Sequence, residues 1–394
     1  MGAPRYKIDE GIKEYGTEFQ KKCVDAVNAH RSMAGAARAL GKGVTTVRDA
    51  VYAVEKKAAI CGYAPEHGMT HTAPAPFVVK GVSTYYNKDG ELTGQWVKTK
   101  LDESQAIEAV KQFIESMMED ARGLSPIVKA PKTSNADLLA VYPFGDPHFG
   151  MYAWAAEAGD DFDLATAERQ TLGAVDSLVE SAPPAETAIL LPLGDVFHAN
   201  DQTNQTPGHK HQLDVDSRYP KVIGVGIKTF RHAILRALEK HKKVIVRIEP
   251  GNHDPQAKWA LALALAAYFE NDPRVEVDLS PSKFWFYRFG KVLIGTTHGD
   301  TVKHEGLPGV MAADRAEEWG QTKHRYWYTG HVHHTAVREF PGVVCESFRT
   351  LAAKDAFAAG HGYRAGRDMR CIVHHRHHGE VARYRCDISM LEAA

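Results

Sequence analysis

The sequence predicts an α/β protein with a small helical segment ahead of it. Five short apolar runs between residues 136 and 329 are separated by helical or loop sequence, which is typical of buried strands in an α/β domain, although the later runs are also open to antiparallel pairing. Ahead of them, residues 17–59 repeat apolar side chains at helical spacing, and residues 77–100 hold two β-prone runs. We therefore expect a helical module at 1–60, a connector of linker, hairpin and helix at 61–135, and the α/β domain at 136–394.

Composition and charge are those of a soluble globular protein. With 394 residues, 44% hydrophobic and 25% charged, the chain is long enough for two or three domains. Its formal net charge is -1, so no overall field attracts nucleic acid or a membrane surface. Any such partner must meet a local patch.

Cysteine and apolar patterns indicate the compartment. Five scattered cysteines without a CxxC pair argue against a disulfide framework and against a thiolate zinc site. The most apolar run, residues 259–269, is about half as long as a bilayer span. We expect a cytoplasmic protein that does not contact membranes.

The helical module predicts three helices within residues 17–59. Ser32 is the expected N-cap of the second helix, a glycine-containing break follows, and Thr45 or Thr46 is expected to open the third. This arrangement resembles a helix-turn-helix, whose third helix would enter a DNA major groove. Residues 1–60 hold 11 Lys or Arg against 7 Asp or Glu, which is modest support, and a plain docking module stays open.

The connector predicts a β-hairpin and one helix. Residues 61–76 are rich in Gly, Pro, His and Thr, as linkers are. The runs FVVKGVSTYY and LTGQWVKTK flank Asn87–Gly90, a sequence that suits a hairpin turn, and a helix capped by Asp102 is expected at 102–122. No cluster of catalytic residue types lies here, so we interpret the segment as a connector or wing.

Each of the five apolar runs of the α/β domain is followed by polar residues that can bind metals. Because the carboxyl ends of strands lie at one edge of a sheet, we expect these residues to converge. Asp146 and His148 follow the first run, Asp195 and His198 the second, Asn252, His253 and Asp254 the third, His298 the fourth, and His331 and His333 the fifth.

These residue types suit a pair of divalent ions. Two ions about 3.5 to 4 Å apart can bind both the attacking and the leaving oxygen of a phosphoryl group. A carboxylate can bridge two cations, while imidazole and amide groups complete their shells without adding charge. Any one of these clusters alone is more often a solvated loop, but five in order predict a metal centre.

In that order the motifs resemble the calcineurin-like metallophosphoesterases, over about residues 136–387. The resemblance implies a four-layer αββα sandwich that holds two divalent ions, with manganese expected and magnesium, zinc or iron as alternatives. It implies one ion at Asp146, His148, Asp195 and His333, and a second at Asp195, Asn252, His298 and His331, so that Asp195 bridges both.

The same resemblance implies a mechanism, in-line attack on phosphorus by a metal-bound hydroxide. His253 corresponds to the family histidine that contacts the phosphate and protonates the leaving oxygen, and we expect Asp254 to orient it and favour its charged form. A further ligand or a core histidine is the alternative reading of His253.

The string GDVFHAN, residues 194–200, bears on the substrate. It lacks the acid and arginine that protein phosphatases carry there, and it resembles the Mre11 and SbcD group of DNA exonucleases. This makes His198 a substrate-positioning residue, with an ordinary loop histidine as the alternative. Cationic and titratable groups in the loop at 208–221 agree with a polyanionic substrate.

We therefore expect a metal-dependent phosphodiester hydrolase, a DNA nuclease of exonuclease type, that meets DNA at its active site and at the N-terminal helices. A small-molecule or cyclic-nucleotide phosphodiesterase or phosphatase is the alternative, and a DNA-binding regulator without catalysis is a third reading. The histidine-rich stretch at 374–378 is expected to be an exposed hairpin turn rather than a further metal site.

Overall fold

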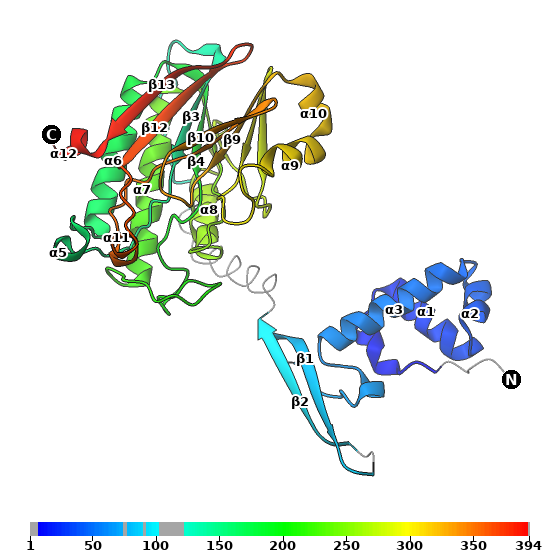
Figure 1. Cartoon of the computed structure of the whole chain (residues 1–394). Helices are drawn as coiled ribbons and strands as arrows, with labels where there is room; N and C mark the ends of the chain where they lie inside the picture. The colour runs from blue at the N-terminus through cyan, green and yellow to red at the C-terminus, as the bar shows by residue number, and fades with distance from the viewer. Residues whose placement is uncertain (1–6, 74–76, 90–91, 102–121, 393–394) are drawn as a thin grey trace. The chain divides into compact units, whose positions relative to one another are not determined.

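The computed structural model describes residues 7–73, 77–89, 92–101 and 122–392 (Figure 1). The chain divides into two compact units, residues 1–109 and 110–394. The helix expected at 102–122 lies outside the described residues, apart from Arg122. Within the described ranges, no helix has both the length and the apolar character needed to cross a membrane.

The smaller unit contains helices followed by a hairpin. Its helical elements are η1 (Glu10–Tyr15), α1 (Glu18–His30), α2 (Met33–Leu40), α3 (Val44–Ile60) and η2 (Pro65–His67). The antiparallel hairpin is formed by β1 (Phe77–Tyr86) and β2 (Leu92–Leu101), as the sequence predicts. The short helix η2 interrupts the stretch that was expected to be a plain linker.

Helix caps in this unit follow the prediction in one case and differ in another. Ser32 is confirmed as the N-cap of α2, since its Oγ accepts the Gly35 N–H at 3.0 Å. The caps expected for the third helix are wrong, because α3 begins directly behind Gly43, without a side-chain cap, and Thr45 and Thr46 lie inside it. Gly41 ends α2 with a left-handed φ of 61°, and only residues 41–43 separate it from the first residue of α3.

The core of the three helices is small and apolar. It contains fully buried residues from each helix: Cys23, Val24 and Val27 of α1, Ala36 of α2, and Val47, Val51 and Val54 of α3. Val44, which shares their helical spacing in the sequence, is instead exposed at the start of α3.

A six-stranded sheet holds the first three predicted strands of the larger unit. Its order is β13-β12-β3-β4-β5-β6, with β3 to β6 parallel and β12 antiparallel to β3. The strands are β3 (Asn135–Phe144), β4 (Ala185–Pro192), β5 (Lys243–Val246), β6 (Val275–Val277), β12 (Asp368–His375) and β13 (Gly379–Asp387).

The other two predicted strands lie in a separate five-stranded sheet, of order β10-β11-β9-β8-β7. These strands are β7 (Trp285–Phe289), β8 (Val292–Thr296), β9 (His324–Thr329), β10 (Ala336–Phe340) and β11 (Val343–Ser347). The pairs β8–β9 and β9–β11 are parallel, and the edge strands are antiparallel to their neighbours. The expectation of one common sheet edge is therefore wrong, because the five runs are divided between two sheets.

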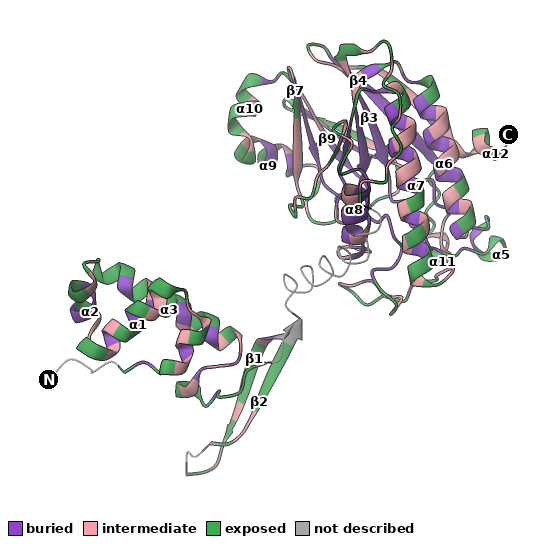
Figure 2. Cartoon of the chain, turned by 180° about the vertical axis from the view of Figure 1, so that it is seen from behind, coloured by how far each residue is buried: buried purple, intermediate pink, exposed green. Residues whose placement is uncertain are grey.

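The two sheets pack face to face, with helices on their outer sides. Leu139, Val141 and Ile189 of one sheet meet Val292 and Ile294 of the other in a common core. The long helices α6 (Leu164–Ser181), α7 (Tyr219–Lys240) and α8 (Ala257–Tyr268) cover the six-stranded sheet, and α9 (Leu307–Asp314) and α10 (Ala316–Gln321) cover the five-stranded sheet. Figure 2 shows buried and exposed stretches alternating along α6 and α7. The short helices α5 (Ala155–Ala158), α11 (Ala356–Gly360) and α12 (Ile388–Glu392) complete the unit.

Polar contacts also join the sheets. Glu346 on β11 is 1% exposed, and its carboxylate accepts hydrogen bonds from Arg370 on β12 and Arg383 on β13 at 2.5 to 2.9 Å. Tyr328 on β9 and His374 on β12 share a hydrogen bond of 2.8 Å between the hydroxyl and Nε2.

His374 corrects the expectation of an exposed turn at 374–378. Its side chain is fully buried inside β12, and burial lowers its pKa to about 3. The turn itself is shorter than expected: His377 and His378 are exposed, and Gly379 follows with a φ of 75°. Strand β12, with its alternation of side chains between the two faces, includes the first two histidines of this stretch, which were expected to belong to the turn.

The burial of a second histidine should make the free energy of unfolding depend on pH. His241 is fully buried behind α7, between the Tyr142 hydroxyl at 2.9 Å and the Ala185 carbonyl at 2.7 Å, and burial lowers its pKa to about 4. Because the unfolded chain binds this proton near pH 6.5, acid favours unfolding. Lowering the pH from 7 to 5 should cost the metal-free protein about 2 kcal/mol through His241 alone. Urea unfolding of His241→Gln should show a weaker pH dependence than the wild type, and an equal dependence would contradict this assignment.

Candidate metal centre

Five loops bring most of the predicted metal residues together, those behind β3, β4, β5, β8 and β9. Among the described residues, three groups have His or Asp atoms within 4.8 Å of one another. The groups are Asp146, His148 and His333; Asp195, His298 and His331; and His148, His198 and His253. The first two correspond to the two predicted ion sites without Asn252 and without a shared Asp195.

The first group joins the loop behind β3 to the loop behind β9. His148 and His333 approach with their Nε2 atoms 3.1 Å apart, and the Asp146 Oδ1 lies 3.9 Å from the His333 Nε2. The Asp146 carboxylate also accepts the His331 N–H at 2.9 Å, which ties the two loops through the backbone. Both Asp146 and His148 are buried.

The second group is centred on His298 in the loop behind β8. Its Nδ1 donates to the Leu193 carbonyl at 2.8 Å, so Nε2 is the nitrogen that faces the side chains of the site and that a metal ion could bind after losing its proton. That Nε2 is 3.2 Å from the Asp195 Oδ2 and 3.0 Å from the Asn252 Oδ1. Asn252 thus reaches this group through His298, and the His331 ring lies beside it with centroids 5.0 Å apart.

His298 also connects the two groups, because its Nδ1 lies 3.6 Å from the Asp146 Oδ1. Asp195 contributes in a different way: its Oδ1 accepts the His253 N–H at 2.8 Å, and its backbone carbonyl accepts the His148 N–H at 3.0 Å. The two groups therefore form one continuous polar site between the sheets.

The third group is a cluster of imidazoles. The His198 Nδ1 lies 3.3 Å from the His148 Nδ1, and the His198 and His253 rings stack with centroids 5.3 Å apart. The His253 Nδ1 donates to the His198 carbonyl at 2.8 Å, so its Nε2 remains available. His198 is only 1% exposed, and its Nε2 has no hydrogen-bond partner. A buried nitrogen without a partner is costly unless a ligand or an ion meets it.

The expectation that Asp254 orients the His253 ring is wrong. Its fully buried carboxylate accepts the Gly251 N–H and the Phe197 N–H, each at 3.1 Å, and it does not bond to the His253 imidazole. The physical reason is the tight backbone turn at 251–254, which sends consecutive side chains in different directions. Asp254 therefore holds two loops together, while a backbone carbonyl orients His253.

The backbone is held in an unusual conformation at the candidate ligands. Nine non-glycine residues in the described ranges have a positive φ, and five of them are Asp146, His148, Asp195, His331 and His333. This left-handed region is disfavoured for residues with a side chain, and such strain gathers at functional sites.

Two glycines make room for the carboxylates. A Cβ added at Gly251 would lie 2.0 Å from the Asp195 Oδ1, and one at Gly330 would lie 2.6 Å from the Asp146 Oδ2. No side chain fits at either position. The glycine beside each motif therefore lets the neighbouring loop approach the carboxylate of another motif.

Burial and crowding shift the pKa values of the carboxylates in this site. Burial raises the pKa of Asp146 to about 8 and that of Asp254 to about 6, and the nearby Asp195 adds to both shifts. Although burial acts to raise the pKa of Asp195, His298 holds it well below its usual value. Three carboxyl groups thus share one buried space, which a divalent cation would stabilise.

The histidines divide into two kinds. Burial lowers the pKa of His148 and lowers that of His333 to about 4, so both are neutral at pH 7, the form that binds metals. For His298, burial acts to lower the pKa, but Asp195 and Asp146 raise it to about 10. The donor set and its charges therefore fit divalent cations.

Metal binding should release protons. At pH 7 the metal-free protein holds a proton on Asp146 and a second one on His298, and both must leave before these atoms bind a cation. We expect about two protons to be released, and affinity to rise by up to about a hundredfold per pH unit below pH 8. Calorimetric titration with Mn²⁺ in buffers of different protonation enthalpy measures the number released. Asp146→Asn should lower it by about one, and binding without proton release would contradict the assignment.

Sequence reasoning missed Asn200, although it is the last residue of GDVFHAN. Its buried Oδ1 accepts the Gln256 N–H at 2.8 Å and the Ala257 N–H at 3.2 Å, at the start of α8, and the Tyr219 hydroxyl donates to its carbonyl at 2.7 Å. Asn200 thereby fixes the loop behind β4 against the helix that follows the loop behind β5. The signal in the sequence was the residue type, because asparagine often caps the N-terminus of a helix. Asn200, however, is far in sequence from the helix that it caps.

Asn200→Ala is expected to destabilise the protein. It removes a cap from two N–H groups at a buried helix end, which should cost about 1 to 2 kcal/mol of unfolding free energy. Urea unfolding of the metal-free protein measures this loss. Gln202→Ala, at an exposed position on the same loop, is the control, and an equal effect of both would count against the capping role.

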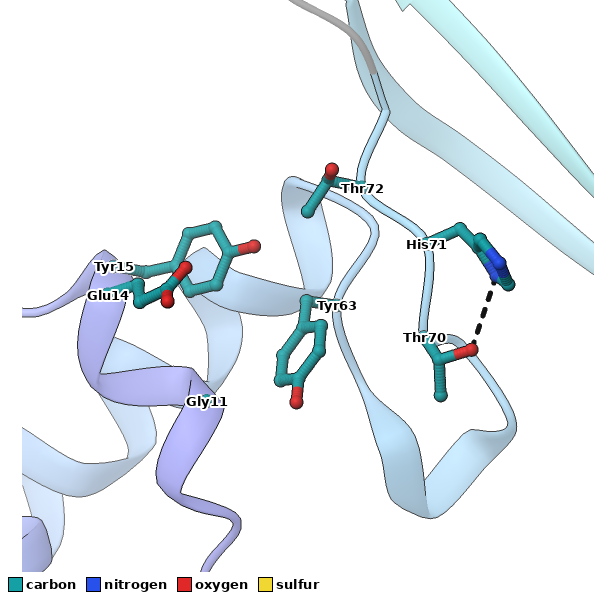
Figure 3. A pocket seen from close by; sticks show the side chains of 7 residues that line it. All are labelled: Gly11, Glu14, Tyr15, Tyr63, Thr70, His71 and Thr72. Atoms are coloured by element: carbon teal, nitrogen blue, oxygen red, sulfur yellow. Dashed lines mark hydrogen bonds between the residues drawn. The ribbon is translucent and has the colours of Figure 1, made fainter.

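A hollow of about 350 Å³ lies in the smaller unit and is not a metal site. It is lined by residues of η1, by Tyr63 and by residues 70–72, with the Tyr15 and Tyr63 rings stacked at 5.9 Å and the Thr70 hydroxyl 3.2 Å from the His71 Nδ1 (Figure 3). One histidine and one carboxylate, Glu14, line it, too few for a metal centre.

Comparisons with known proteins give structural matches only. No family model and no curated protein matches the chain by sequence. Similar solved structures include a dimetal phosphatase from Danio rerio, with 8% identity and a TM-score of 0.31, covering 64% of this chain and 99% of that chain. Vacuolar Protein Sorting 29 from Cryptosporidium parvum has 14% identity and a TM-score of 0.30, with coverages of 64% and 98%.

A further solved structure is a conserved protein of Streptococcus pneumoniae, described as a predicted phosphoesterase. It has 9% identity and a TM-score of 0.26, and it covers 64% of this chain and 98% of that chain. Two of these three descriptions name a phosphatase or a phosphoesterase. At these identities and TM-scores, the matches assign this chain neither to a family nor to an activity.

Proposed function

We propose that the protein is a dinuclear-metal-dependent phosphodiester hydrolase, and that DNA is its substrate. The observation that carries the proposal is the meeting of two His/Asp groups between the sheets, joined by His298, which lies 3.2 Å from Asp195 and 3.6 Å from Asp146. The order of layers, helices, sheet, sheet and helices, agrees with the sandwich that the sequence resemblance implies.

In this proposal, Asp146, His148, Asp195 and His333 hold one ion, and Asp195, Asn252, His298 and His331 hold the other. Two bound divalent ions lower the pKa of a water and neutralise phosphate charge. The mixture of carboxylate, amide and imidazole donors suits Mn²⁺, which we propose, as well as Mg²⁺, Zn²⁺ or Fe²⁺. The two oxygens of Asp195 have different partners, which is the arrangement that a bridging carboxylate needs.

His253 is the proposed acid. Its Nδ1 donates to the His198 carbonyl, so the ring is fixed and its Nε2 is the nitrogen left for a phosphate oxygen or a leaving oxygen. His198 stacks on it and keeps the unpartnered Nε2 described above. We propose that His198 positions the substrate from this buried place.

DNA is the proposed substrate because of the loop behind β4. Backbone hydrogen bonds from Tyr152 to Asp214 and from Asp216 to Gly150 hold this loop beside the segment that follows His148. Residues 208–221 carry three Lys or Arg and two His against two Asp. A modest positive excess next to the site favours a phosphate backbone. The helices α1 to α3 are a proposed second contact with DNA.

A metal-by-substrate panel tests the proposal. The full chain, freed of metal and then given Mn²⁺, Mg²⁺, Zn²⁺ or Fe²⁺, is incubated with linear and circular DNA, single and double stranded, and with bis-p-nitrophenyl phosphate and cyclic nucleotides. Cleavage of DNA and of the synthetic diester supports the nuclease. Turnover of the small diesters alone would move the assignment to a small-molecule phosphodiesterase, and no turnover with any metal would overturn hydrolysis.

A further inference from the structure

One face of the hairpin in the smaller unit carries two exposed aromatic rings. In the antiparallel register Ser83 pairs with Trp96, Tyr85 with Gly94 and Gly81 with Lys98. Since side chains of paired residues share a face and alternate along each strand, Tyr85, Trp96 and Lys98 lie on the same face. We call this face, with Gly81, Ser83 and Gly94, the aromatic face.

The opposite face of the hairpin is the one turned toward the rest of its unit. It carries Thr84 and Gln95, and the Gln95 Nε2 donates to the His67 carbonyl at 3.0 Å and to the Thr84 Oγ1 at 3.2 Å. The aromatic face has no such contacts to the described residues of this unit.

The aromatic face is open. Trp96 is 66% exposed and Tyr85 is 59% exposed, and Figure 2 shows much of β1 and β2 as exposed. A Cβ added at Gly81 or Gly94 would have no atom within 4 Å. Two large aromatic rings are exposed to water here, which is less favourable than burying them. Exposed apolar surfaces of this kind commonly bind partners.

The charges around the rings are positive. Lys98 lies on the aromatic face and Lys80 at the bulge beside Gly81. The segment 77–101 holds four lysines against one Asp and one Glu. Protein–protein interfaces are enriched in aromatic residues but depleted in lysine, so rings flanked by lysines favour nucleic acid over a protein partner.

We propose that the aromatic face binds single-stranded nucleic acid, with bases stacked on Trp96 and Tyr85 and phosphates near Lys98 and Lys80. The rings are diagonal cross-strand neighbours about 7–8 Å apart, wider than the 3.4 Å spacing of stacked bases, so each ring takes a separate base of an extended strand. Paired bases in a duplex are covered by their neighbours and cannot stack in this way. The inference does not depend on hydrolysis at the metal centre.

The proposal is tested by measuring how the full chain binds labelled oligonucleotides. Fluorescence anisotropy reports the binding, and EDTA is present so that cleavage does not interfere. Single-stranded DNA and RNA should both bind, because stacking on a ring is tolerant of base and sugar. Trp96→Ala should weaken single-strand binding by about fivefold to about a hundredfold. Lys98→Gln should reduce the slope of log affinity against log salt by about 0.7.

Gly94 offers a test that leaves both rings in place. Because the space opposite Tyr85 is empty, Gly94→Lys and Gly94→Glu should both fold, and they should strengthen and weaken single-strand binding respectively. Val97→Thr, on the opposite face of the same strand, is the matched control and should leave affinity unchanged. Equal shifts from both Gly94 variants, unchanged binding in Trp96→Ala, or an equal loss of duplex binding would each overturn the proposal.

Discussion

Replacing Asp195 by asparagine is expected to lower kcat/KM for a phosphodiester by at least about a thousandfold, because the variant loses the charge that is proposed to serve both ions, a contribution of several kcal/mol. Metal analysis of the purified variant should find fewer than two ions for each chain. The fold should survive, since asparagine keeps an Oδ1 that can accept the His253 N–H. Hydrolysis of bis-p-nitrophenyl phosphate at saturating Mn²⁺ measures the loss.

Asp300→Asn is the matched control for this experiment. Asp300 follows His298 by two residues and lies 3.9 Å from the Lys283 ammonium, but it belongs to none of the three His/Asp groups. It should therefore bind two ions and retain most of its activity. If Asp195→Asn also kept two ions and its activity, the bridging role would be wrong.

The largest stability effect is expected at Arg247, which is fully buried behind β5. Its guanidinium donates to both carboxylate oxygens of Glu249 at 3.0 and 2.8 Å, to Asp278 at 2.8 Å and to the Ser280 carbonyl at 2.9 Å. Arg247→Met leaves the buried Glu249 carboxylate without its counter-charge. The expected cost is about 3 to 5 kcal/mol of unfolding free energy, measured by urea unfolding.

An exposed ion pair between β5 and β6 provides the control. The Lys243 ammonium lies 2.6 Å from the Glu276 carboxylate, and both side chains are about half exposed. Because solvent screens this pair, Lys243→Ala should cost less than about 1 kcal/mol. A similar loss from both variants would mean that burial of Arg247 does not determine its contribution.

The sequence allowed the candidate metal residues to be singled out because each stands at a break in apolar patterning. Buried strands appear as apolar runs, and the polar residues behind them have no packing role, so Asp146, Asp195 and His298 are conspicuous. The division of the strands between two sheets was not predictable in this way. The sequence of an apolar run does not indicate which other run it pairs with. The runs of β8 and β9 therefore have the same apolar pattern as those of β3 and β4, although they belong to another sheet.

Other errors arose where backbone geometry decides the outcome. Asp254 is next to His253 in sequence, which suggested a contact, but the turn directs its carboxylate to the Gly251 and Phe197 N–H groups. His374 stands in a polar stretch, but strand alternation places it in the core. Asn200 acts on a helix 56 residues away, and only the tertiary structure shows that helix beside it.

The position of the candidate metal centre between two sheets has a consequence for variants far from it. Asp146, Asp195 and Asn252 follow strands of one sheet, whereas His298, His331 and His333 follow strands of the other. The separation of these two sets is therefore determined by how closely the sheets approach, and that depends on the apolar side chains between them and on the Tyr328–His374 contact. A change in the volume of that core would alter the ligand spacing without touching a ligand. In a genetic screen, such core variants would behave like ligand variants.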